Sequence, residues 1–325
     1  MIVPIGQDRI LNFFRQLIND GRLGHAYMLC GGAGCGKKTL CRYITSLAMC
    51  SSHTACGSCN GCLTVTSGAN PDVIYISNDD KASIGVDKIR TLIGKMYVRP
   101  LVSDKKIFII DNAHLLTTGA QNALLKAIEE PPSYAVFFLL CDSTASILDT
   151  IMSRVARIDV PPLSAEHLRT IAPGCQEFLY HYCTGNPGRL IEIKDDGNFA
   201  KMRNRAVEAM GAVISDNGFD MYEYADLFEG DRQKANTAFD IMLMFVRDVI
   251  LCKNGLDTMV INKDKINEIK EFSSSVTAMG AARIAETISA APAQMGKGGS
   301  IAMAWQAMFI KCREVINDRS SRYTL

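Results

Sequence analysis

A glycine-rich loop with two lysines, GGAGCGKKTL (residues 31–40), has the composition of a phosphate-binding loop. Gly31, Gly36 and Lys37 occupy the glycine and lysine positions of a Walker A motif. Glycines allow backbone N–H groups to curl around a phosphate, and the following helix points its positive end at the same place. The loop follows the apolar run AYMLC and precedes a predicted helix, Thr39–Ala48. This is the context that the motif requires.

Two positions depart from a working ATP-hydrolysing site. The residue after the loop lysine normally supplies a hydroxyl ligand for magnesium, but here it is Lys38, and Thr39 comes one place late. Asp111 ends an apolar run, as a magnesium-holding aspartate would, but its neighbour is Asn112 instead of the glutamate that commonly orients the attacking water. Asparagine cannot accept a proton at neutral pH. The two departures together predict a loss of hydrolysis.

Nucleotide binding is a separate question, and two alternatives stay open for it. A second ammonium could help to hold ATP or ADP by charge, or the loop could be empty and purely structural. The candidate nucleotide-binding residues are Gly31, Gly34, Gly36, Lys37, Lys38, Thr39 and Asp111.

Four of the twelve cysteines, Cys50, Cys56, Cys59 and Cys62, form a C-x5-C-x2-C-x2-C cluster. Glycine-containing turns can fold four thiolates around one tetrahedral ion, and four sulfurs with no open position suit structural zinc. An iron–sulfur cluster and a metal-free, reduced cluster are the alternatives. His53 lies in the same loop but is not needed as a ligand. The other eight cysteines are assigned no chemistry.

An α/β domain must position these groups, because short apolar runs alternate with helical segments in the first half of the chain. Continuous apolar strands separated by helices predict a parallel sheet that is covered on both faces. The pair Pro161–Pro162 closes this domain, since proline cannot donate to a strand ladder. The predicted strands are Ala26–Cys30, Asp72–Ile76, Lys106–Asp111, Ala135–Cys141 and Ala156–Val160.

Helical patterns fill the rest of the chain. A small helical domain is expected over residues 163–210, with Ser164 capping its first helix. Residues 211–325 show helical spacing without a convincing strand, over Ala235–Cys252, Lys265–Ala291 and Ser300–Val315. The predicted division is therefore 1–162, with the cysteine module at 50–62, then 163–210 and 211–325.

Composition limits the classes of function. The 325 residues have a formal net charge of +1, which argues against a protein that binds nucleic acid through an overall positive field. Any contact with DNA should be local or shared with partners. No run approaches the ~20 apolar residues of a membrane span, and the N-terminus lacks a signal-peptide pattern. We therefore expect a cytoplasmic protein.

The order of several motifs resembles a known family. These are GRLGHAYMLCGGAGCGKK, a four-cysteine module directly after the loop helix, AQNALLKAIEEPPSYAVFFLLCD and SILDTIMSRVARI. Over residues 4–190 they resemble the clamp-loader subunits of bacterial DNA polymerase III, which are AAA+ proteins. The departures at Lys38 and Asn112 favour the delta-prime type over the gamma/tau ATPase. The resemblance implies an AAA+ domain, a helical lid and an all-helical collar domain.

The resemblance also implies a role for Arg154. In this family a Ser-Arg-Cys motif on delta-prime supplies an arginine finger to the ATP site of the neighbouring subunit. Ser153 and Arg154 match this motif, and Val155 replaces its cysteine. The guanidinium carries the chemistry, because it can neutralise charge that develops on a transferring phosphoryl group. An ordinary exposed arginine at a helix end is the alternative.

The expected partners are the gamma/tau and delta subunits, with the sliding clamp and primer-template DNA reached through the assembled complex. Arg189 in GNPGRL and Thr144 after the fourth strand resemble the sensor-2 and sensor-1 positions more weakly. A helix-start arginine and a Ser/Thr-rich turn are their alternatives. Two other functions compete: an ATP-hydrolysing motor of the same family, and a zinc-bearing protein in which the P-loop fold is only a scaffold.

Overall fold

The computed structural model describes residues 2–79, 81–214, 220–230, 232–296 and 300–318. It divides into two compact units. The first takes in the chain up to Gly174 together with Cys183–Ile191, and the second takes in Cys175–Tyr182 together with the chain from Glu192 onward. The predicted boundary after residue 210 falls inside a continuous helix, α10 (Gly197–Ile214). The three-part division stays a prediction.

The first unit is built on a five-stranded sheet with the order β2-β3-β4-β1-β5, in which every neighbouring pair is parallel. β1, β3 and β4 are buried along their whole length, which explains their continuous apolar sequences. The predicted parallel α/β sheet is confirmed, and three of the predicted strands are one residue too long. The bounds are β1 Ala26–Cys30, β2 Val73–Ile76, β3 Lys106–Ile110, β4 Ala135–Cys141 and β5 Ala156–Asp159.

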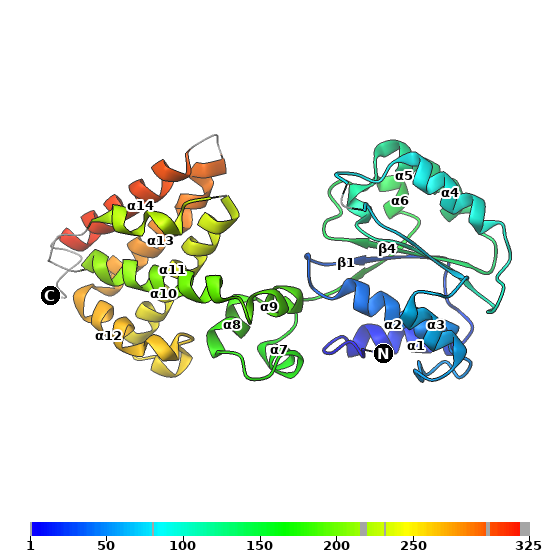
Figure 1. Cartoon of the computed structure of the whole chain (residues 1–325), viewed down its shortest axis with the longest axis horizontal. Coiled ribbons are helices and arrows are strands. Elements are labelled where there is room, and N and C mark those ends of the chain that lie inside the picture. The colour runs from blue at the N-terminus through cyan, green and yellow to red at the C-terminus, as the bar shows by residue number, and fades with distance from the viewer. Residues whose placement is uncertain (1, 80, 215–219, 231, 297–299, 319–325) are drawn as a thin grey trace. The chain divides into compact units, whose positions relative to one another are not determined.

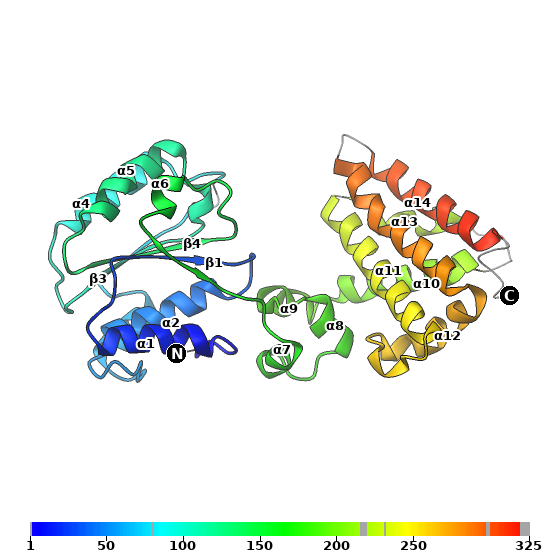
Figure 2. The same ribbon diagram turned by 180° about the vertical axis from the view of Figure 1, so that it is seen from behind.

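Helices cover both faces of this sheet (Figures 1 and 2). α1 (Asp8–Asn19), α2 (Lys37–Met49) and α3 (Asn60–Ser67) lie on one face, and α4 (Val86–Met96), α5 (Thr118–Glu129) and α6 (Asp149–Met152) lie on the other. Successive side chains of a strand point to opposite faces. On β4, Phe137 therefore stacks on Phe108 in one core, at 4.9 Å between ring centroids, while Phe138 stacks on Tyr27 in the other, at 5.5 Å.

Two short helices, α7 (Ala165–Ile171) and α9 (Pro187–Ile193), follow the sheet, with α8 (Glu177–Tyr182) between them in the sequence. The Ser164 side chain accepts a hydrogen bond from the backbone N–H of His167, at 3.2 Å. The predicted N-cap is therefore confirmed.

The described part of the second unit contains helices and no strand, as predicted. The predicted helix Lys265–Ala291 is wrong in one respect, because the chain leaves helical geometry at Val276. The Thr277 hydroxyl accepts a hydrogen bond from the backbone N–H of Gly280, and this cap starts a new helix. No described helix meets the length and apolarity that crossing a bilayer would demand. The long helices are α10 Gly197–Ile214, α11 Arg232–Lys253, α12 Ile266–Ser275, α13 Ala278–Gly296 and α14 Ile301–Asn317.

Buried polar groups fix the second unit internally. Arg203 on α10 forms two bonds of 2.7 Å with the carboxylate of Asp264, and its guanidinium lies 4.2 Å from the ring centroid of Phe178. Asp248 on α11 is fully buried and accepts backbone hydrogen bonds from Ile261 and Asn262. Because a buried charge needs such partners, these contacts hold residues 261–264 against α10 and α11.

Asp72, predicted as the first residue of a strand, instead holds the loop between α4 and β3. Its carboxylate is fully buried and accepts hydrogen bonds from the backbone N–H groups of Leu101, Val102 and Ser103, at 2.7, 2.9 and 3.1 Å. Burial alone would raise the pKa of Asp72, but these hydrogen bonds outweigh burial and hold that pKa below its ordinary value of 3.8.

We expect Asp72→Asn to lower the free energy of unfolding by about 2 kcal/mol at pH 7, because charge-assisted hydrogen bonds are lost. A carboxyl group whose pKa is lowered by folding stabilises the folded state at pH values above its ordinary pKa. This stabilisation is lost as the pH falls through the folded-state pKa. The difference from wild type should therefore narrow below about pH 4. Urea unfolding at several pH values measures it, with Asp104→Asn in the same loop as the exposed control. A constant difference across this pH range would contradict the assignment.

Candidate functional site

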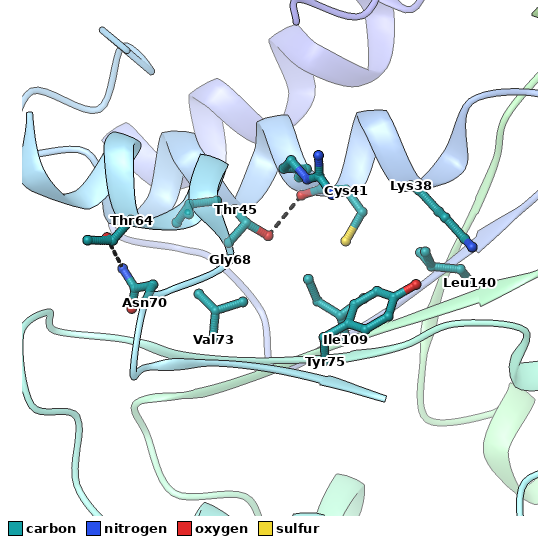
Figure 3. Close-up of a pocket in the computed structure, with 12 residues that line it drawn as sticks. Lys38, Cys41, Thr45, Thr64, Gly68, Asn70, Val73, Tyr75, Ile109 and Leu140 are labelled. Carbon is teal, nitrogen blue, oxygen red and sulfur yellow. Dashed lines mark hydrogen bonds between the residues drawn. The ribbon is translucent and has the colours of Figure 1, made fainter. Parts of the chain in front are cut away.

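The carboxyl ends of β1, β3 and β4 meet at one edge of the sheet because these strands are parallel and in register. Cys30 pairs with Cys141, and Ile110 pairs with Leu139. The loop after β1, Asp111 after β3 and the residues after β4 therefore converge. Figure 3 shows Lys38 on α2 pointing across this edge toward Tyr75 on β2.

The loop has the backbone that its glycines predicted. Gly34 and Gly36 adopt positive φ angles of 77° and 94°, which favour glycine, and α2 begins directly afterwards at Lys37. A Cβ atom on Gly31 would lie 2.7 Å from the carbonyl oxygen of Val160, so this position also requires glycine. Thr39 lies in the first turn of α2.

Lys37 is 8% exposed and is bound by the protein's own groups. Its Nζ donates to the carbonyl oxygens of Gly31 and Gly32, at 2.7 and 2.9 Å, and forms an ion pair of 2.6 Å with Asp142 Oδ1. Asp142 was not predicted from the sequence, and a sensor-1 role for Thr144, a weaker match, stays a prediction. The backbone carbonyl of Thr144 accepts a hydrogen bond from the N–H of Ile147. The available signal was that Asp142 is the first polar residue after the apolar fourth strand.

Lys38 and Asp111 form the second ion pair, at 2.7 Å between Nζ and Oδ2. The lysine side chain is 64% exposed and the aspartate only 3%. The same oxygen accepts a hydrogen bond of 2.6 Å from the Tyr75 hydroxyl. Burial, together with this bond to Asp111, raises the pKa of Tyr75, so the phenol keeps its proton and donates. Asn112 lies at a positive φ of 51° and donates to Asn78.

A cavity of about 320 Å³ opens beside this ion pair, between α2, α3 and the sheet (Figure 3). Its walls are mostly apolar, and Lys38, Arg42 and Tyr75 are among its polar lining residues. Ile109 and Leu140 on the sheet lie opposite Cys41 on α2. The cavity is therefore lined by Lys38 and Tyr75, the two side chains that contact the Asp111 carboxylate.

The donor set does not fit magnesium-nucleotide. Mg²⁺ requires oxygen ligands in near-octahedral geometry, and the ammonium of Lys38 supplies none. That ammonium also occupies the carboxylate oxygen of Asp111 that faces it. The backbone amides of the loop remain suitable for binding phosphate. The residues that do not fit magnesium-nucleotide are the charged side chains at the position of the metal.

Residues 186–188, at the start of α9, lie against the loop. The Asn186 side chain donates a hydrogen bond of 2.6 Å to the carbonyl oxygen of Ala33. The backbone N–H of Gly188 donates one of 3.0 Å to the carbonyl oxygen of Gly34. Arg189 follows in the first turn of α9, where its backbone N–H donates to Asn186. A sensor-2 role for Arg189 stays a prediction.

Arg154 lies just after α6 and is 38% exposed. Its Nη2 forms an ion pair of 2.7 Å with Glu129 at the end of α5, and its Nη1 donates to the carbonyl oxygen of Thr150 at 2.9 Å. These contacts orient the guanidinium from two helices while a third of the side chain remains open to solvent.

The four predicted cysteine ligands come together, with all their Sγ atoms within 4.8 Å of one another. Cys50 Sγ lies 3.7 Å from Cys56 Sγ and 3.8 Å from Cys59 Sγ. Four sulfurs at the Zn–S distance of about 2.3 Å around a tetrahedral ion would be about 3.8 Å apart, so the geometry fits such an ion. Backbone N–H groups of Cys59 and Cys62 point at two of the sulfurs, as an outer shell around thiolates should.

Comparisons with known proteins identify the family. Models described as "DNA polymerase III, delta subunit" and "DNA polymerase III, delta subunit, C terminal" match residues 6–164 and 198–301. The chain is 26% identical over 276 residues to the DNA polymerase III subunit delta' of Bacillus subtilis, covering 82% of this chain and 83% of that one. It is 33% identical over 165 residues to the tau subunit of the same organism, covering 50% of this chain and 29% of that one. A solved gamma subunit-related protein from Thermotoga maritima is 16% identical, with a TM-score of 0.42 over 94% of this chain and 99% of that one.

The contact between the loop and residues 186–188 can be tested at Gly34. A Cβ atom there would lie 2.4 Å from Asn186 Oδ1, in a backbone conformation that other residues avoid. We expect Gly34→Ala to lower the free energy of unfolding by about 1–3 kcal/mol. Gly36 is the matched control, because it also has a positive φ while a Cβ atom on it would meet open space. Equal unfolding free energies for the two variants in urea titrations would show that Gly34 and Asn186 are not in close contact.

Proposed function

The chain belongs to the family of DNA polymerase III delta-type subunits, and on that premise we propose that it is a delta-prime-type subunit of a bacterial replicative clamp loader. In this role it is a hydrolysis-deficient AAA+ stator that helps to assemble a hetero-oligomeric ring with gamma/tau and delta subunits. It acts in the cytoplasm and supports loading of the sliding clamp onto primer-template DNA through the complex.

The ion pair between Lys38 and Asp111 carries the proposed loss of hydrolysis. In working P-loop ATPases a hydroxyl and an aspartate hold the magnesium ion that neutralises charge on the phosphates. Here an ammonium replaces the hydroxyl and occupies the aspartate at 2.7 Å. Asn112 in turn leaves no general base beside Asp111.

A gamma/tau-like motor that hydrolyses ATP is the alternative, and the 33% identity to a tau subunit favours it. That match covers 50% of this chain, whereas the match to a delta' subunit covers 82%, and the chain carries the two departures from a working site, at Lys38 and Asn112. We therefore place this chain with the subunits that do not hydrolyse ATP.

Arg154 is the proposed arginine finger, and its surroundings support this role. Its partners, Glu129 and Thr150, come from α5 and α6 and not from the chain's own phosphate loop. An exposed arginine that is already oriented loses little conformational entropy when it reaches a phosphate on a neighbouring subunit.

We expect Arg154→Ala to leave folding and ring assembly unchanged and to lower DNA-stimulated ATP hydrolysis by the reconstituted ring. An arginine finger in trans can contribute about 10³–10⁵ in rate at one site, and a ring with several sites dilutes that loss to a partial one. Arg154→Lys should rescue poorly, because a point charge lacks the planar fork of guanidinium. Hydrolysis and clamp loading are measured at matched assembly.

Arg157→Ala is the matched control for this experiment. Arg157 is also exposed and forms an ion pair of 2.8 Å, with Asp159, but it belongs to β5. Its loss should leave ring activity unchanged. Equal rates for wild type and both Arg154 variants would mean that Arg154 is a surface residue and that the subunit acts only as a scaffold.

Structural zinc is the proposed metal of the cysteine cluster. Four sulfurs with no open position suit a structural zinc ion, and the Sγ separations of 3.7 and 3.8 Å support it. The module joins α2 to α3, and a Cβ atom on Gly61 would lie 2.0 Å from the carbonyl oxygen of Met49. The ion would therefore tie α3 closely to the end of α2, without a catalytic role.

We expect about one zinc ion per chain in protein purified without chelator, because closed four-sulfur sites bind zinc tightly. Cys59→Ser should lower the zinc content to a small fraction and lower the thermal midpoint. Cys175→Ser, at a partly exposed cysteine outside the cluster, is the control and should keep the full content. Elemental analysis decides, and an iron absorption band or less than a few tenths of an equivalent in wild type would exclude zinc.

A further inference from the structure

Two fixed charges of opposite sign lie where a P-loop protein would place its ligands. The loop lysine of a working site reaches the β- and γ-phosphates, and the following hydroxyl reaches Mg²⁺. In this chain Lys37 meets the carboxylate of Asp142, and the residue after it is itself a cation that meets Asp111. Each ion pair thus contains one group of the usual machinery and one replacement.

The Lys38 ammonium is a tethered competitor of Mg²⁺. Lys38 is the second residue of α2, a helix of 13 residues, so its Nζ cannot diffuse away from Asp111. A tethered group acts at an effective concentration of about millimolar or above, which rivals free Mg²⁺ before geometry is considered. Asp111 is 3% exposed and is also held by the Tyr75 hydroxyl, so an incoming ion would have to break two contacts.

The Asp142 carboxylate competes in the same way with a phosphate. The carboxylate lies 2.6 Å from Lys37 Nζ. The backbone N–H of Asp142 donates a hydrogen bond to His114 Nδ1, and this bond fixes the start of the segment after β4. A phosphate that reached Lys37 would approach this carboxylate closely. Asp142 is 32% exposed, so solvent weakens the repulsion between these like charges but does not remove it.

We infer that Lys38 and Asp142 are built-in substitutes for Mg²⁺ and phosphate, and that the phosphate loop of this chain does not take up magnesium-nucleotide. The ion pairs, together with the contacts of Asn186 and Gly188, hold the loop in shape without a ligand. The loop therefore keeps its contact with α9 whatever the nucleotide concentration.

This inference deepens the proposed function, on which it rests only for the absence of hydrolysis. It can be tested on the isolated full-length chain without any ring partner. Uptake of nucleotide by that chain would overturn it and would leave the proposed role of Arg154 untouched.

The experiment compares wild type with Lys38→Thr, Asp142→Asn and the double variant by calorimetric titration with ATP and ADP, each with and without MgCl₂. We expect no binding to wild type up to about 1 mM nucleotide. The double variant should bind nucleotide in the presence of Mg²⁺ at least about tenfold more tightly than this limit, with a dissociation constant of about 0.1 mM or lower. Lys37→Ala in the double variant should abolish the gained binding and so place it at the loop. Lys88→Thr, which removes another lysine that pairs with an aspartate, is the control and should gain nothing.

Each result decides. Binding by wild type, with or without Mg²⁺, would overturn the inference, and so would a folded double variant that gains no affinity, since another feature would then exclude the nucleotide. If the double variant does not fold, Lys38→Thr decides alone: Mg²⁺ should raise its thermal midpoint, because Asp111 has lost its cation, and should leave that of wild type unchanged. No shift in Lys38→Thr would also overturn the inference.

Discussion

The parallel register of β1 between β4 and β5 is the constraint on which the site depends. Cys30, the last residue of β1, pairs with Cys141 on one side and Asp159 on the other. The ladder then continues one step, because Gly31 donates its N–H to the carbonyl of Cys141 and Val160 donates to that of Cys30. The phosphate loop therefore leaves the sheet at a fixed place, and the residues after β3 and β4 are brought within reach of its lysines.

A buried carboxylate at this edge also explains why a lysine suits position 38. Asp111 follows the buried strand β3 and would be an uncompensated charge if nothing paired with it. Because Lys38 is 64% exposed, solvent screens this ion pair, and it stabilises the fold less than a fully buried pair would. An ammonium at the start of α2 removes the need for Mg²⁺ as a counter-ion. In the proposed role, the lysine that would prevent hydrolysis thus also neutralises the carboxylate at this edge of the sheet.

Features fixed by local sequence could be predicted, and features fixed by distant partners could not. The glycine loop, the apolar strands, the Ser164 cap and the cysteine cluster depend on residues near one another in the chain, and all were foreseen. Asp142 and Asp72 act through lysine and loop groups that are 105 and about 30 residues away. The break at Val276 was missed because the apolar spacing continues through it, while the cap that decides the ending is a single hydroxyl.

The helix α2 connects the two chemically distinct parts of the first unit. Its first turn holds both lysines, and its last residue, Met49, directly precedes Cys50. Thirteen residues at 1.5 Å each give a rod of about 20 Å, packed into the core by Leu40, Ile44 and Leu47. A helix that is held along its length by the core keeps its two ends in a fixed relation to each other. A metal at the cysteine cluster would therefore restrain the same helix that presents Lys38 to Asp111. The metal at one end of α2 and the ion pair at the other would both favour a single position of the phosphate loop.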